Sequence, residues 1–109
     1  MESNMVRLLE PQDCLRLVDQ YFKREFKNFK LIKCTSYTGY WWLEYQNENN
    51  LRICFDGDIG GHFYVKIIIE KEELELWQYN RSVNNVSQST KENILYQLSI
   101  LKSFLENMG

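Results

Sequence analysis

The feature that most constrains this chain is a run of alternating apolar residues between Tyr40 and Tyr79. Alternation with a period of two places every second side chain on the same side of a β-strand. Short polar stretches interrupt the run at 46–50, 56–61 and 70–73. The pattern therefore predicts an antiparallel meander, and a weaker pattern over 31–37 adds a first strand at one edge, so that strands occupy about residues 30–79.

The register follows from pairing residues so that side chains of one kind share a face, because a slip of one residue would reverse every side chain. Opposing Phe55 to Phe63 gives the middle hairpin one wholly apolar side. The same rule sets Trp41 opposite Phe55 and Leu74 opposite Ile69. The predicted sheet therefore has two unlike faces.

One predicted face is apolar and must be buried, which contributes roughly 1.5 to 3 kcal/mol for each large side chain. It comprises Trp41, Leu43, Leu51, Ile53, Phe55, Phe63, Val65, Ile67, Ile69, Leu74 and Leu76. The other face mixes aromatic with charged residues and includes a cross-strand ion pair between Glu44 and Arg52. That face comprises Tyr40, Trp42, Glu44, Arg52, Asp56, His62, Tyr64, Lys66, Trp77 and Tyr79.

Two amphipathic helices flank the predicted meander. The first spans about 11–28 and begins at Pro11, which suits the first helical position because no N–H is needed there. The second spans about 89–108, where Ser89 and Glu92 have the spacing of a capping box. Apolar residues recur along both helices at steps of three or four and are expected to pack in the core. They are Leu15, Val18, Phe22, Phe26 and Phe29 in the first helix, and Ile94, Leu98, Leu101, Leu105 and Met108 in the second.

These elements predict one two-layer α+β domain over residues 1–109, with a sheet of four or five strands. The net charge of −2 gives no electrostatic footprint for a nucleic-acid backbone. Residues 1–7 contain no apolar run behind a basic start, so we expect neither a signal peptide nor a membrane span. Cys14, Cys34 and Cys54 lack Cys-x-x-Cys spacing and suit reduced thiols in the cytoplasm.

The segment 56–62 is the strongest candidate for a chemical site. It lacks the glutamate of a calcium loop and the Gly-Lys-Ser/Thr of a phosphate loop, so we interpret it as a hairpin loop with glycines at positive φ. His62 is the only histidine, and the derived register brings it beside Asp56 and near Cys54. A nucleophilic arrangement can be drawn from these three residues, but no oxyanion hole accompanies it. We predict no catalytic activity, no cofactor and no metal.

The aromatic and charged face has three interpretations. A helix can cover it, or it can stack nucleic-acid bases, although the basic and aromatic signature of RNA-binding sheets is missing. The third is a protein-binding surface, because Trp and Tyr ringed by charges are typical of interface hot spots. On that interpretation the contact residues are Tyr40, Trp42, Arg52, Tyr64, Lys66, Trp77 and Tyr79.

The run from Trp42 to Ile53 is an extended aromatic strand, an Asn-rich turn and an alternating strand. Together with the order helix, meander, helix, it resembles small bacterial immunity proteins of polymorphic and contact-dependent growth inhibition toxin systems. The resemblance lies in the architecture. It implies a cytoplasmic protein that binds a cognate toxin domain and blocks its active site, and an acidic chain suits a basic nuclease as that toxin.

The alternative is a small acidic secretion chaperone, which holds an extended segment of a client protein and acts as a dimer. Such chaperones have a helix in the middle of the sheet, and none is predicted between Tyr40 and Tyr79. An immunity protein is expected to be a monomer or a weak homodimer and to bind a folded domain. Stoichiometry and the folded state of the partner separate the two hypotheses.

Overall fold

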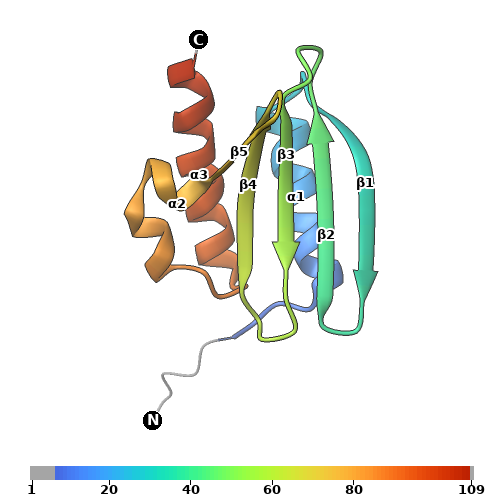
Figure 1. Cartoon of the computed structure of the whole chain (residues 1–109). Coiled ribbons are helices and arrows are strands. Elements are labelled where there is room, and N and C mark those ends of the chain that lie inside the picture. Colours follow the sequence, from blue (N-terminus) through green and yellow to red (C-terminus); the bar gives the residue numbers. More distant parts are fainter. Residues whose placement is uncertain (1–6, 109) are drawn as a thin grey trace.

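The computed structural model describes residues 7–108 and has the predicted two-layer α+β fold. A five-stranded antiparallel meander lies between an N-terminal and a C-terminal helix, and both helices lie on the same side of the sheet (Figure 1). The elements are α1 (Pro11–Glu25), β1 (Lys30–Tyr37), β2 (Tyr40–Gln46), β3 (Arg52–Gly57), β4 (Phe63–Ile69), β5 (Glu72–Glu75), α2 (Leu76–Tyr79), the 3₁₀ helix η1 (Arg81–Asn85) and α3 (Lys91–Met108).

Helix α1 begins at Pro11 as predicted but ends at Glu25, three residues before the predicted end. The Phe26 N–H donates to the Phe22 carbonyl, and the chain then leaves the helix toward β1. The predicted apolar stripe faces the core, where the Phe22 ring stacks on Tyr45 with centroids 3.8 Å apart. The Tyr45 hydroxyl donates to an Asp19 carboxylate oxygen at 2.9 Å, so this buried phenol has a partner at the edge of α1.

Helix α3 begins at Lys91, two residues later than predicted, because Thr90 caps it. The Thr90 hydroxyl oxygen accepts a hydrogen bond from the Asn93 N–H at 3.1 Å. The predicted capping box at Ser89 is wrong, since the Ser89 N–H donates to the Gly61 carbonyl and its own carbonyl accepts from Leu9. Most of the predicted apolar seam packs in the core, where Ile94, Leu98 and Leu101 are fully buried, but Met108 at the end of the helix is 46% exposed and lies outside the core.

The strands lie in chain order from β1 to β5, and β1 forms the predicted edge. Both faces have the predicted parity, but the register of all three predicted hairpins is wrong by two residues. Phe55 lies opposite Val65 instead of Phe63, and Trp41 lies opposite Gly57 instead of Phe55. In the last hairpin Leu74 lies opposite Ile67. A shift of two residues keeps every side chain on its face, so alternation alone does not exclude it.

Hydrogen bonds in the turns explain the observed register. The Asn47 side-chain oxygen accepts from the N–H groups of Asn49 and Leu51, and the turn between β2 and β3 occupies 47–51, one residue later than predicted. The Asp58 side-chain oxygen accepts from Gly60 and His62 in the same way in the next turn. These are local side-chain to backbone bonds of the kind that Asn and Asp favour in turns.

The last strand is shorter than predicted. Strand β5 ends at Glu75, and residues 76–79, expected to continue the strand, form α2 instead. The Gln78 side-chain oxygen accepts from the Glu75 N–H at 2.8 Å and helps to start this helical turn. Leu76 is buried as predicted, but it reaches the core from a helix.

Within residues 7–108, no helix is both long and apolar enough to cross a membrane. The expectation of no signal peptide concerns residues 1–7. Residues 1–6 of this segment lie outside the described residues.

We predict that Gly57→Ala destabilises the protein although φ at Gly57 is not positive. The Trp41 indole lies directly over Gly57, and a methyl group there would overlap the ring. Overpacking of this kind costs about 1 to 3 kcal/mol, which urea unfolding of the variant measures.

Gly60→Ala in the neighbouring turn is the matched control, because its added methyl group would lie 3.3 Å from an Asp58 carboxylate oxygen and 3.8 Å from the His62 ring, without overlap. We expect a clearly smaller loss there. Equal losses of stability in the two variants would contradict the close packing of Trp41 on Gly57.

Candidate functional site

One side of the sheet has no helix over it, as Figure 1 shows. Strand pairing defines the side chains on that side, because partners in an antiparallel pair point the same way. We call this surface the open face. Its residues are Lys33, Thr35 and Tyr37 of β1, Tyr40, Trp42, Glu44 and Gln46 of β2, Arg52, Cys54 and Asp56 of β3, Tyr64, Lys66 and Ile68 of β4, and Glu73 and Glu75 of β5.

Five of the predicted contact residues lie on the open face, namely Tyr40, Trp42, Arg52, Tyr64 and Lys66. The side chains of Tyr40 and Tyr64 are 47% and 41% exposed. Trp42, Arg52 and Lys66 are half-buried, because they lie against neighbouring strands. None of the five is covered by a helix, which contradicts the interpretation that this face belongs to the core.

Trp42 is held in place by charged neighbours. Its indole N–H donates to Glu44 at 3.0 Å, and the second Glu44 oxygen lies 3.3 Å from the Arg52 guanidinium. The Lys33 ammonium sits 5.7 Å from the centroid of the Trp42 ring, within the range of a cation–π contact. The predicted pair of Glu44 and Arg52 is therefore confirmed, although Glu44 lies directly opposite Cys54 and reaches Arg52 diagonally.

Carboxylates surround Tyr64 at the other end of the open face. Strand pairing sets Asp56 opposite Tyr64. Desolvation raises the Tyr64 pKa, and the negative charges of Asp58, Asp56 and Glu75 raise it further. The surroundings of Tyr64 are therefore acidic. Asp56 also lies opposite Trp42, so that ring has two carboxylates, Glu44 and Asp56, and two cations, Lys33 and Arg52, near it.

Trp77 was predicted to lie in the last strand, and that placement is wrong because it belongs to α2. The helical turn nevertheless leaves Trp77 36% exposed. Together with Tyr64 and Glu75 it lines a shallow pocket of about 120 Å³ at the edge of the open face. Trp77 therefore adjoins this face without being part of the sheet.

Tyr79 was also predicted on this face, and the structure corrects that placement. Its hydroxyl lies 3.1 Å from the Ser103 hydroxyl and accepts from the Asn107 side-chain amide at 3.0 Å. Its ring packs edge-on against Phe104 with centroids 5.1 Å apart. All three partners belong to α3, so Tyr79 attaches α2 to that helix.

The structure does not bring Cys54, His62 and Asp56 together in the nucleophilic arrangement that the predicted register allowed. Asp56 lies opposite Tyr64, while the His62 Nδ1 atom lies 2.8 Å from the Ser87 hydroxyl in the chain before α3. Burial raises the pKa of the Cys54 thiol to about 11, so it is protonated near neutral pH. Among residues 7–108, no group of three or more His, Cys, Asp or Glu side chains is placed to hold a metal ion.

Sequence reasoning missed the contribution of Lys33. This residue lies in the predicted edge strand, and strand pairing brings its ammonium over the Trp42 ring. A weak signal existed, because the segment 31–37 was predicted as a strand beside β2.

Comparison with models of protein families, with curated proteins and with solved structures finds no match to this chain. The open face itself therefore supplies the basis for proposing a function. The open face is a surface of aromatic and charged residues, a composition that suits contact with another macromolecule.

We predict that one of the three thiols reacts rapidly with Ellman's reagent in the native protein. Cys34 is exposed on β1, whereas Cys14 and Cys54 are buried with pKa values raised to about 12 and about 11. The two buried thiols should react only after denaturation. Absorbance at pH 8 measures the extent of reaction with Ellman's reagent.

A Cys34→Ser variant should lose the fast reaction and keep the two thiols that react after denaturation. Rapid reaction of native Cys54 in that variant would contradict the burial of its thiol beneath neighbouring side chains of the open face.

Proposed function

We propose that this chain is a non-catalytic immunity protein that neutralises a cognate bacterial toxin domain by covering it with the open face. The observation that carries the proposal is the uncovered sheet surface on which Trp42, Tyr40 and Tyr64 stand among charged residues. Tryptophan, tyrosine and arginine dominate the residues whose truncation weakens protein complexes most.

Preorganisation of Trp42 supports this proposal. The hydrogen bond to Glu44 and the Lys33 ammonium near the ring hold the indole in place before any partner arrives. A side chain that is already ordered loses little conformational entropy on binding, so more of the contact energy stabilises the complex. Glu44 is itself held by Arg52, so that Trp42, Glu44 and Arg52 form a prepared contact point.

The charges of the open face support a folded partner with mixed charge. Lys33, Arg52, Glu44 and Asp56 lie around Trp42, and Asp56, Asp58 and Glu75 lie around Tyr64. Charge patterns of this kind select a partner and speed its association more than they strengthen the final complex. The carboxylates near Tyr64 suit a basic surface, as a nuclease toxin would offer, and such a partner places the protein in the cytoplasm.

A small secretion chaperone is the second candidate, and the edge strand β1 favours it. Leu31 and Ile32 are 45% and 48% exposed there, and the backbone of an edge strand can pair with an extended segment. The successive connections between the five strands contain no helix, in contrast to the arrangement expected of such chaperones. The immunity proposal therefore takes precedence.

We predict that Trp42→Ala weakens binding of the partner by about thirtyfold or more, since truncating a hot-spot residue costs about 2 kcal/mol or more. The tagged protein captures the partner from cells that carry both genes, and calorimetry with the purified partner then measures the affinity. Co-expression supplies the functional readout, in which the wild type restores growth of cells that produce the partner and Trp42→Ala does not.

Tyr96→Ala is the matched control, because Tyr96 is an exposed aromatic residue on α3 and away from the open face. Its affinity should equal that of the wild type, provided that urea unfolding shows both variants folded. Equal affinity of Trp42→Ala and wild type would contradict the open face as the binding surface. Capture of an unfolded client segment by a dimer would favour the chaperone instead.

A further inference from the structure

A groove of about 630 Å³ lies on the helix side of the sheet, where α1 and α3 end. Both helices run toward the end of the sheet that carries the turn between β2 and β3 (Figure 1), and Asn47 and Asn49 of that turn line the groove. We call it the helix-end groove. Its volume is within the range of about 300 to 1,000 Å³ that is typical of sites for small ligands.

The lining of the helix-end groove includes a continuous set of apolar side chains from three parts of the chain. They are Phe26 and Phe29 after α1, Leu51 and Ile69 of the sheet end, and Leu105 of α3. Phe26 and Leu51 belong to the hydrophobic core and are 8% exposed, so the remaining surface of this floor faces the groove. An apolar chain placed there would remove this surface from water.

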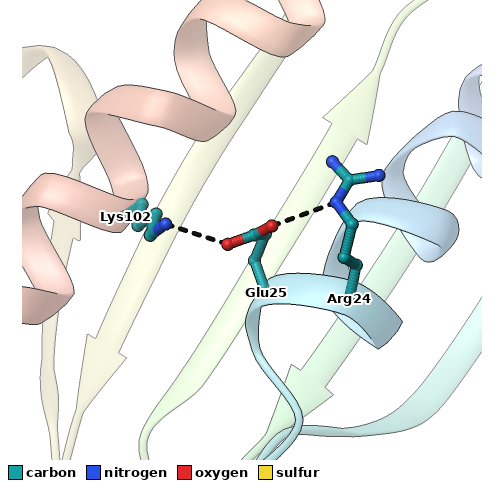
Figure 2. Close-up of polar contacts among 3 residues, drawn as sticks. All are labelled: Arg24, Glu25 and Lys102. Carbon is teal, nitrogen blue, oxygen red and sulfur yellow. Dashed lines mark hydrogen bonds and ion pairs between the residues drawn. The ribbon is translucent and has the colours of Figure 1, made fainter.

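Two basic residues and a bridged carboxylate form one rim of the groove. Figure 2 shows Glu25 between the helices, with one oxygen 2.8 Å from the Lys102 ammonium and the other 3.0 Å from Arg24 Nε. These hydrogen bonds lower the pKa of Glu25, first through Lys102 and then through Arg24. Arg24 uses Nε for this contact, and its two Nη groups point away from Glu25.

The charge of the rim is unevenly distributed. Glu106 raises the pKa of Lys102, as Glu25 does more strongly, while Glu25 also accepts a hydrogen bond from Arg24 on the α1 side. Lys27 stands exposed on the α1 side, and in the part of the chain that the structure describes no carboxylate lies within ion-pair distance of it.

We infer that the helix-end groove binds a small amphipathic anion, an alkyl carboxylate whose chain lies on the apolar floor and whose head meets Arg24 Nη and Lys27. A guanidinium fork matches the planar carboxylate, and the ammonium of Lys27 adds a second positive charge beside it. This site goes beyond the proposed function. It lies on the side of the sheet opposite the open face. The experiments on this groove and on the immunity proposal can therefore succeed or fail independently of each other.

Titration of the ¹⁵N-labelled protein with sodium decanoate tests the inference. We expect saturable amide shifts at 26–29, Leu51, Ile69 and Leu105, and an affinity at least tenfold higher than that for decan-1-ol, which has the chain without the charge. Sodium acetate, which has the charge without the chain, should produce no saturable shift. Equal affinities for decanoate and decanol, or shifts scattered over the molecule, would overturn the inference.

Lys27→Glu should weaken decanoate binding about tenfold or more, because it replaces an attractive charge with a repulsive one. Lys91→Glu is the matched control, since Lys91 is exposed at the opposite end of α3 and the net charge changes equally. Both variants replace exposed side chains, and their melting temperatures establish that they fold. Equal weakening in the two variants would show only a general charge effect and would overturn the assigned site.

Discussion

Burial of one apolar face of the sheet against α1 and α3 is the interaction on which the rest of this structure depends. Trp41, Leu43 and Tyr45 of β2 form part of that face, and Phe22 of α1 stacks on Tyr45. Helices this short derive most of their stability from such packing. Because the large side chains of both helices meet the same face, the position of every other element follows from this contact.

Covering one face with both helices leaves the other side of the sheet to solvent. That side is rich in aromatic residues, and its charges hold Trp42 in position through Glu44, Arg52 and Lys33. On the proposed function, stability and binding therefore depend on opposite faces of the same strands. The helix-end groove arises from the same arrangement, because α1 and α3 end beside each other over the apolar end of the sheet.

Alternation in the sequence predicted the fold and the two faces, but it could not predict the register. A period of two determines which face a side chain occupies and is unchanged by a shift of two residues. Side chains in the turns decide the difference, as Asn47 and Asp58 show. The placement of Trp77 and Tyr79 failed for another reason, since four residues at a strand end carry too short a pattern to separate a helical turn from a strand.

Hydroxyl-radical footprinting of aromatic side chains, read by mass spectrometry, tests the central claim that one face is covered and the other open. In the free protein, we expect rapid oxidation of Tyr40 and Tyr64, slower oxidation of half-buried Trp42, and protection of Trp41 and Tyr45, which are 3% and 2% exposed. Oxidation of Trp41 and Tyr45 as fast as that of Tyr64 would contradict the account, because the helices would then not cover the apolar face.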